Sequence, residues 1–373
     1  MNKVFVFANI GDINKPPKGG GGQSSSRRVM QGFRNAGLEV SCLSRHFAQW
    51  RGKVAHIIEV LLFAVIDLVK IVYHLRKEDK KSTIFYHMTF SGPLLPYEYI
   101  VTKIVNRLGF KSIMYLQGGQ FYYYYRIKGK KYRQLFAKVL DMQEIVQFEG
   151  KEGIDLASSI TSTPLSYFPS YTFNQDIPST PPERSTESIR LLFFGRIDPN
   201  KHIEIVIDCF EVLCKQRDNI YLTIIGGPGS SKRYVEEIDL KIQNSVHRNH
   251  IDRFGLSPFD FIKEKMKTHH FFIFPTTEPC EGHSNALSEA MSQGLIPIVH
   301  DHNFNRSIVG DDLFVVNDLD PSSYAKKIIN ILDTGDISSL FTKMIERERM
   351  LYSYDAVNPQ IVKELKSITS LQV

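Results

Sequence analysis

Two glutamates eight positions apart, Glu281 and Glu289, mark the part of the chain whose residue types could do chemistry. The apolar run 271–275 before them is typical of a buried parallel strand, and residues 286–294 favour a helix that ends at Gly294. Glu289 would then lie in the first helical turns and Glu281 in the loop before them. Loops that follow the carboxyl end of a strand bind ligands in open α/β sheets. The start of a helix attracts phosphate, and a carboxylate beside it can bind sugar hydroxyl groups. The spacing therefore predicts a nucleotide-sugar site.

The same stretch is similar to a known motif. Residues 281–289 resemble the Glu-x7-Glu motif of the retaining family 4 (group 1) glycosyltransferases, which have the two-domain GT-B fold. Three more segments resemble the donor domain of that family in the expected order. Residues 189–210 resemble its opening strand, Gly-Arg turn and Lys-bearing helix, residues 221–229 its next strand and Gly turn, and residues 295–301 the strand after the motif. The first half resembles the family only loosely.

The resemblance implies an α/β protein of the GT-B class, with two Rossmann-like doubly wound parallel-sheet domains that face a cleft. The expected parts are an acceptor-side domain (1–169), a linker rich in Ser, Thr and Pro (170–188), a nucleotide-sugar-binding domain (189–345) and a helical tail that crosses back to the first domain (346–373). A chain of 373 residues suits two domains of ordinary size. The helical pattern after residue 337 is expected to break near Pro359.

The resemblance also implies the roles of individual residues. A diphosphate leaving group that no metal holds needs fixed positive charge, and Arg196 and Lys201 would supply it. Glu281, near the reacting carbon, would complete the catalytic set. Neither a metal nor another cofactor is expected, because the nucleotide-diphosphate sugar is itself a substrate. The expected donor-binding residues are Glu289, His283, Ser284, Asn285, Ala286, Gly226, Phe254, Gly21 and Gly22. Ser284 or Asn285 could cap the helix, and His283 could equally be a packed core residue.

A Gly-rich stretch lies in the first half, between an expected strand (3–10) and an expected helix (29–36). Gly19 to Gly22 would let the backbone approach a ligand, and Ser24 to Ser26 could cap the helix. A flexible connector is the alternative interpretation. Gln23 and Gln117 are expected on the acceptor side, and Gln117 stands where many members of the family carry a histidine. Gln can bind a sugar hydroxyl group but cannot act as a base.

Charge is unevenly distributed along the chain. Residues 1–168 hold 24 Lys and Arg against 12 Asp and Glu, a net charge of +12, whereas the rest is acidic. The basic half predicts an anionic partner such as lipid headgroups or a lipid-phosphate acceptor, and no nucleic-acid motif accompanies it. Four cysteines without a CxxC pair suit a reducing cytosol. We therefore expect a cytoplasmic protein with possible peripheral contact with the inner face of an anionic membrane.

Two segments of the first half bear on that contact. Residues 54–75 are largely apolar, with five polar residues (His56, Glu59, Asp67, Lys70 and His74) on a stripe roughly 80° wide. They predict either a helix packed on the sheet with one wet edge or a helix in a membrane interface. Residues 121–138 combine aromatic and basic side chains. They predict a patch that borders the acceptor site and docks on the membrane, or an ordinary solvated helix.

Together these features predict a retaining, metal-independent glycosyltransferase. It would transfer a sugar from a nucleotide-diphosphate sugar to a lipid-linked saccharide of a bacterial surface polysaccharide, such as capsule or O-antigen. A sugar-nucleotide epimerase of the same fold and a non-catalytic nucleotide-sugar-binding subunit are the alternatives. A phosphorylase of this fold is excluded, because it would need a pyridoxal-bearing lysine and a longer chain.

Overall fold

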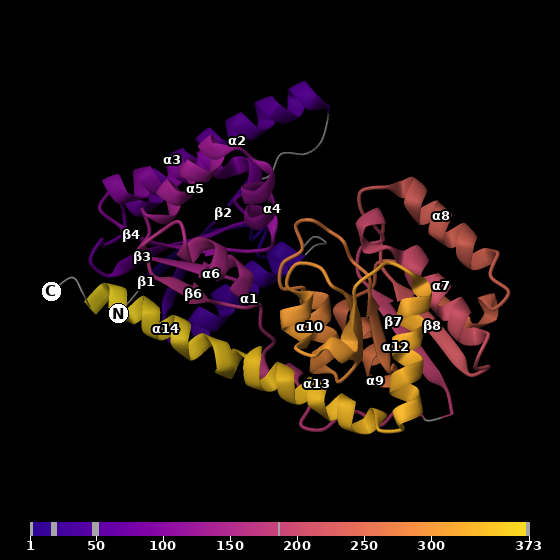
Figure 1. Cartoon of the computed structure of the whole chain (residues 1–373). Coiled ribbons are helices and arrows are strands. Elements are labelled where there is room, and N and C mark those ends of the chain that lie inside the picture. The colour runs from indigo at the N-terminus through magenta and orange to yellow at the C-terminus, as the bar shows by residue number, and fades with distance from the viewer. Residues whose placement is uncertain (1–2, 16–20, 47–51, 186, 371–373) are drawn as a thin grey trace. The chain divides into compact units, whose positions relative to one another are not determined.

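A computed structural model describes residues 3–15, 21–46, 52–185 and 187–370 (Figure 1). The chain divides into two compact units, Met1–Pro169 with Val357–Val373, and Ser170–Ala356. Each unit contains a six-stranded parallel sheet covered by helices. The expected fold class, α/β with two doubly wound parallel sheets, is confirmed. Among the described helices, none combines the length and the apolar composition that crossing a membrane requires.

The sheet of the first unit has the strand order β2-β1-β3-β4-β5-β6. The strands are β1 (Lys3–Ala8), β2 (Glu39–Ser44), β3 (Thr83–Thr89), β4 (Lys111–Leu116), β5 (Ile145–Phe148) and β6 (Leu165–Tyr167). The helices are α1 (Gly21–Asn35), α2 (Lys53–Leu75), η1 (Gly92–Leu94), α3 (Leu95–Arg107), α4 (Gln120–Ile127), α5 (Lys130–Leu140), α6 (Lys151–Ser158) and, from Val357 on, α14 (Tyr354–Ser370). The strand order reverses between β1 and β3, which is the point where such sheets bind ligands.

Apolar side chains from strands and helices form the core of this unit, as expected for a parallel sheet buried on both faces. One cluster joins β1 and β3 to α2 and α3 through Phe5, Phe7, Ile71, Leu75, Phe85, Val101, Val105 and Phe110. A second joins β4 and β5 to α3, α4, α5 and α6 through Leu95, Met114, Leu116, Phe121, Phe136, Val139, Leu140, Val146, Phe148 and Ala157. Helix α3 packs against both α2 and α5, so these three helices lie side by side on one face (Figure 1).

A buried charge network lies beneath α3. Glu98 is fully buried, and its Oε1 lies 2.6 Å from Arg45 Nη2 and accepts a 2.8 Å hydrogen bond from Thr89 Oγ1. The other carboxylate oxygen lies 2.9 Å from His87 Nε2. Burial disfavours the ionised form, but attraction to Arg45 and His87 outweighs it and lowers the pKa of Glu98 to about 2. The network therefore holds an ionised carboxylate inside the unit.

The sheet of the second unit has the order β12-β11-β10-β7-β8-β9. The strands are β7 (Ile189–Phe194), β8 (Ile220–Ile225), β9 (Ile251–Phe254), β10 (Phe271–Phe274), β11 (Ile296–His300) and β12 (Val315–Val316). The helices are η2 (Asn174–Asp176), η3 (Pro199–Lys201), α7 (Ile203–Cys214), α8 (Lys232–Gln243), η4 (Arg248–His250), α9 (Phe259–Thr268), α10 (Asn285–Ser292), α11 (Asn305–Val309), η5 (Asp312–Phe314), α12 (Pro321–Thr334) and α13 (Ile337–Leu351). The chain builds β8 and β9 on one side of β7 and then β10 on the other, so the switch point lies between β7 and β10.

Backbone segments approach closely at the carboxyl end of β7 and β8. A Cβ atom on Gly226 would lie 1.8 Å from the carbonyl oxygen of Gly195, so only glycine fits there. Just beyond, Ile197 N–H donates to Gly227 O, and Gly229 N–H donates to Ile197 O, both at 2.9 Å. These bonds join the two loops that follow the strands into one backbone unit.

The start of α1 differs from the prediction. The helix was expected to begin at Val29, but it begins at Gly21 and includes Ser25 and Ser26, which are buried within it and do not cap it. Ser26 Oγ donates to Gly22 O at 2.9 Å, a bond that a serine makes inside a helix. Gly19 falls outside the described residues, as does Gly20.

The C-terminal helical region is interrupted at a different place from the one expected. Pro359 lies inside α14, and the interruption comes at Tyr352 and Ser353. Tyr352 O accepts from Thr172 N–H at 2.8 Å, and Ser353 Oγ accepts from Ala356 N–H at 3.2 Å, which caps the new helix. Pairing with the segment at Thr172 therefore sets the break, and the proline does not.

The polar stripe of α2 faces water only in part, whereas one interpretation expected a wet edge: His74 is exposed, and His56, Glu59 and Lys70 are half-buried. Asp67 is buried, and its Oδ2 accepts a 3.1 Å hydrogen bond from His46 N–H. The opposite, apolar side of the helix is exposed. The periodicity showed two faces, and the contact of Asp67 with His46 turns part of the polar face inward.

We expect Glu98→Gln to lower the free energy of unfolding by about 3–5 kcal/mol at pH 7, because it leaves the buried Arg45 without a counter-charge. The pKa of Glu98 is lower in the folded protein than its ordinary value of 4.5. Its contribution is therefore complete above pH 4.5 and is lost as the pH falls toward 2. Urea unfolding, followed by circular dichroism between these pH values, measures the free energy of unfolding. This free energy should fall less steeply with decreasing pH in the variant than in the wild type.

The control for this prediction is Glu39→Gln, which removes a half-exposed partner of Lys3. That change should cost less than about 1 kcal/mol. Equal losses in the two variants would contradict the role given to the buried network.

Gly226→Ala should lower the free energy of unfolding by about 2 kcal/mol or more, because its methyl group would collide with the Gly195 carbonyl. Gly255→Ala is the matched control, since a Cβ atom there meets nothing within 4 Å. Thermal unfolding of the two variants tests the difference. If both melt alike, the close approach does not constrain residue 226.

Candidate functional site

The two loops at the switch point of the second sheet are joined by an ion pair. Lys201 ends η3 in the loop after β7, and Glu281 lies in the loop after β10. The ammonium group of Lys201 contacts the carboxylate of Glu281, and both side chains are nearly buried. Lys201 Nζ also lies 5.0 Å from the ring centroid of Phe274. Two of the three predicted catalytic residues are thus brought together, although 80 positions separate them.

Asp198 holds Lys201 in place. It caps η3 by accepting a 3.3 Å hydrogen bond from Asn200 N–H. Its other carboxylate oxygen accepts from Ser230 N–H at 2.8 Å and from Ser230 Oγ at 2.7 Å. Burial tends to raise the pKa of Asp198, but these hydrogen bonds and the nearby Arg196 lower it overall. Asp198 is therefore an ionised anchor between the loops after β7 and β8.

Hydrogen bonds also hold the loop that carries Glu281. The carbonyl of Asn200 accepts from Thr277 N–H at 2.8 Å and from Thr276 Oγ1 at 3.2 Å. From the loop after β11, Asn303 Nδ2 donates to Glu281 O at 3.0 Å. The position of Glu281 thus depends on three loops of the same unit.

Sequence analysis missed Asp198, Thr276 and Asn303. The order Asp-Pro-Asn at 198–200 is a helix-start signal that could have identified Asp198 as a cap. Asn303 has a positive φ of 46°, which asparagine tolerates better than most residues, but its partner is distant in sequence. No local pattern could have found it.

Arg196, the third predicted catalytic residue, lies just beyond the end of β7 and is exposed. It follows Gly195, whose φ of 148° turns the chain out of the strand. Its charge contributes to the lowered pKa of Asp198, so it lies on the same side of the sheet as the anchor of Lys201. An exposed guanidinium near the aspartate that anchors Lys201 can bind an incoming anion.

The predicted residues of α10 take different positions. Ser284 occupies the N-cap position but makes no side-chain capping bond. Asn285 begins the helix, and its Oδ1 accepts from Ser170 Oγ at 2.6 Å. Ala286 follows, and Glu289 lies half-buried in the second turn. The helix start therefore faces the loop of Glu281 with the backbone geometry that suits phosphate.

His283 is a packed residue. Its Nε2 lies 2.8 Å from Ser288 Oγ, and its ring meets that of Tyr352 edge-on at 4.7 Å. The side chain is buried. His283 was predicted either to bind the donor or to be a packed core residue, and the observed side-chain contacts are those of a packed residue.

Gly226 and Phe254 lie together at the ends of β8 and β9, where Gly226 N–H donates to Phe254 O at 3.0 Å. The ring of Phe254 packs edge-on against Phe261, and Lys265 Nζ lies 4.8 Å from its centroid. The requirement for glycine at 226 comes from Gly195, so donor contact at 226 stays a prediction.

Four predicted residues belong to the first unit. Gly21 and Gly22 form the first turn of α1, where a Cβ atom on Gly22 would lie 2.9 Å from Phe90 Cζ. Gln23 lies against Gly11, which precedes it in the loop after β1. Gln117 is buried and donates from Nε2 to Ser25 Oγ at 3.0 Å. These contacts tie the start of α1 to the loops after β1, β3 and β4.

The described part of the chain contains no group of three or more His, Cys, Asp and Glu side chains that could hold a metal ion. The charged groups at the switch point include Lys201, Glu281, Asp198 and Glu278, with Arg196 at the surface. This arrangement can bind a polar ligand that carries both hydroxyl groups and negative charge.

Comparison with solved structures shows the same fold elsewhere. Sucrose-phosphate synthase from Thermosynechococcus elongatus matches with a TM-score of 0.76 at 13% identity, over 100% of both chains. A glycosyltransferase from Rickettsia africae matches with a TM-score of 0.73 at 14% identity, over 98% of both. HepE of Anabaena, solved in complex with UDP, matches with a TM-score of 0.70 at 11% identity, over 98% of this chain and 100% of its own. At these identities the matches establish the GT-B fold.

A search of the curated proteins returned no significant match. The comparison with protein families finds one match, which lies within the second unit. The family described as "Glycosyl transferases group 1" matches residues 177–350, which include β7, the Lys201 loop, the Glu281 loop and α10. This part of the chain therefore matches the domain that the group 1 glycosyltransferases share.

Proposed function

We propose that the protein is a retaining, metal-independent glycosyltransferase that transfers a sugar from a nucleotide-diphosphate sugar to a saccharide acceptor. The observation that carries this proposal is the Lys201–Glu281 pair at the switch point of a group 1 glycosyltransferase domain. A cation without a partner could bind any anion, and a carboxylate without a partner could bind any hydroxyl group. Together they suit a ligand in which a diphosphate is joined to a sugar.

In this proposal the donor lies across the carboxyl ends of β7 and β10. Lys201 and Arg196 neutralise the diphosphate, which gains charge as the bond between the anomeric carbon and the phosphate oxygen breaks. Glu281 binds hydroxyl groups of the transferred sugar, and Glu289 binds those of the ribose. The start of α10 donates backbone N–H groups to phosphate.

The acceptor oxygen forms the new bond to the anomeric carbon on the face from which the diphosphate departs, and its proton passes to the leaving phosphate oxygen. This step needs no protein base. Gln117, buried and hydrogen-bonded to Ser25, is compatible with it because an amide does not take up a proton. Retention of configuration follows from attack on the same face.

The donor class is supported by the relatives. HepE of Anabaena has been solved with UDP and with UDP-glucose, and these ligands make uridine nucleotide sugars the first donors to test. The acceptor is proposed to be a lipid-linked saccharide in bacterial surface polysaccharide synthesis. The net charge of +12 on residues 1–168 supports this class, because it favours an anionic lipid phosphate. We propose a cytoplasmic location with peripheral contact with the membrane.

Nucleotide binding is the first test. In a thermal-shift screen of nucleoside diphosphates and their sugars, the compounds that carry one particular base should raise the melting temperature of the protein, because their binding stabilises the folded state by mass action. Lys201→Met should weaken that binding about 10- to 100-fold, because a charge-assisted bond to the diphosphate is lost. Lys326→Met, at an exposed position of α12, should not change it. Equal binding by wild type and Lys201→Met would contradict the assigned role.

Turnover separates an enzyme from a binding subunit. Glu281→Ala should reduce the transfer rate by about 10²- to 10³-fold, with the nucleotide-induced melting shift retained. Glu237→Gln, an exposed carboxylate on α8, is the control and should transfer at the wild-type rate. The anomeric configuration of the product, read by NMR, tests retention. Release of an isomerised sugar without an acceptor would instead indicate an epimerase.

A further inference from the structure

One helix of the first unit exposes an unusual amount of apolar surface. Six aliphatic side chains of α2 are each 50–63% exposed: Ile57, Ile58, Leu61, Leu62, Val65 and Val69. Their spacing of three and four residues places them on one face of the helix. Contiguous apolar patches on soluble proteins usually mark a contact surface.

The attachment of α2 explains why this face points outward. Its C-terminal part is held in the core by Ile71 and Leu75, and the buried Asp67 pairs with His46. Among the described side chains from Val54 to Ile66, none is fully buried. The N-terminal half of α2 is thus an apolar helix that its own unit leaves largely uncovered.

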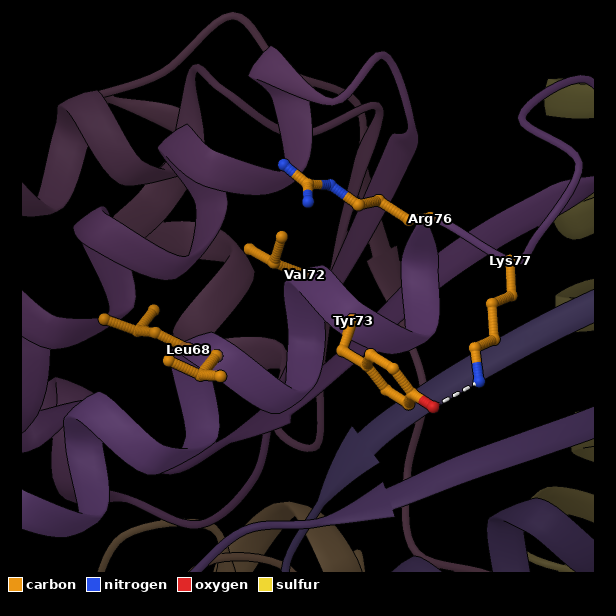
Figure 2. A pocket seen from close by; sticks show the side chains of 6 residues that line it. Leu68, Val72, Tyr73, Arg76 and Lys77 are labelled. Carbon is orange, nitrogen blue, oxygen red and sulfur yellow. Dashed lines mark hydrogen bonds between the residues drawn. The ribbon is translucent and has the colours of Figure 1, made fainter.

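The C-terminal end of the apolar face carries side chains of the types that are common at a water–lipid boundary. A hollow of about 570 Å³ is lined by Leu68, Val69, Val72, Tyr73, Arg76 and Lys77. Figure 2 shows the side chains that line it. Lys77 Nζ lies 3.8 Å from the Tyr73 ring centroid and donates to its hydroxyl oxygen at 2.6 Å. Tyrosine, lysine and arginine place apolar stems in hydrocarbon and polar ends at headgroups.

The same unit also exposes basic side chains on other helices. Helix α3 lies between α2 and α5, and the stretch of α4 and α5 exposes Arg126, Lys128, Lys130, Lys131, Arg133 and Lys138. Anionic lipid attracts such clusters, whereas the cores of protein interfaces are depleted in lysine. An apolar helix face together with exposed cations in the same unit therefore favours lipid over a protein partner.

We propose that the outer face of α2 lies in the headgroup–acyl boundary of an anionic membrane, with the cations of α4 and α5 on the same surface. The helix lies in the plane of the membrane, because Glu59, Asp67 and Lys70 on its other side oppose immersion in hydrocarbon. The proposal rests on the proposed function, since a lipid-linked acceptor is met at a membrane, and it names the surface through which that contact is made.

The test is flotation of the full chain with vesicles of phosphatidylcholine alone or with 30% phosphatidylglycerol added, roughly the content at which polybasic surfaces bind. The double variant Leu61→Gln, Val65→Gln should lower the partition coefficient at least about tenfold, because two exposed apolar side chains are removed. Leu240→Gln, Val246→Gln is the matched control, since both residues are exposed apolar side chains of the second unit. Unchanged flotation of the α2 variant would overturn the proposal.

The basic stretch is tested separately. Changing Lys128, Lys130, Lys131 and Arg133 to serine should weaken binding to anionic vesicles and make it less sensitive to salt, because the screened electrostatic part is lost. Binding and salt dependence equal to those of the wild type would contradict the assigned orientation.

Two further measurements separate this proposal from its alternatives. Light scattering gives the oligomeric state. A wild-type dimer that the α2 variant converts to monomer, with flotation unchanged, would show that the face joins two copies and would overturn the proposal. Nucleotide-induced melting shifts are measured without vesicles. Absence of wild-type flotation with a normal shift refutes membrane docking alone, whereas α2-dependent flotation without any nucleotide response supports docking and refutes the proposed transferase.

Discussion

The pairing of Lys201 with Glu281 is the interaction on which the candidate site depends. It joins the loops that follow β7 and β10 at the point where the strand order of the sheet reverses. Both groups are nearly buried, so each is costly to hold without the other. The surrounding bonds of Asp198 and Asn303 fix the loops before any ligand arrives. In the proposed function, a preorganised pair of this kind would exchange its mutual contact for contacts with the diphosphate and the sugar.

Backbone geometry makes this preorganisation possible. The approach of Gly226 to the Gly195 carbonyl allows two loops to bond to each other directly, and Asp198 then ties them to η3. A side chain at 226 would separate the loops that Asp198 connects. Gly226 and Asp198 thus act at the same place: Gly226 lacks a side chain and lets the loops approach, and Asp198 accepts the hydrogen bonds that hold them together.

The first unit contains buried charged side chains and also exposes apolar side chains. Arg45 and Glu98 lie inside it, and Asp67 turns inward to His46, so the apolar side of α2 is left outside. This is the reverse of the usual arrangement of an amphipathic helix on a globular domain. Polar contacts at its inner face help to set the orientation of α2, and its exposed apolar face is the surface that we propose to contact lipid.

Much of the architecture could be predicted from the sequence. The apolar run 271–275 identified β10, and the expected strand at 3–10 contains β1. The residues around Glu281 and Lys201 predicted where a nucleotide sugar would bind. These signals are local, because strand burial and helix periodicity are written in neighbouring residues. The domain match to group 1 glycosyltransferases agrees with that interpretation.

Other features were decided by the tertiary structure alone. The early start of α1, the interruption at Tyr352 and the role of Asn303 each depend on a partner distant in sequence. The same holds for α2, since its sequence specified two faces and the contact of Asp67 with His46 turns part of the polar face inward. Periodicity is a property of neighbouring residues, whereas hydrogen bonds and ion pairs depend on which segments the sheet topology brings together.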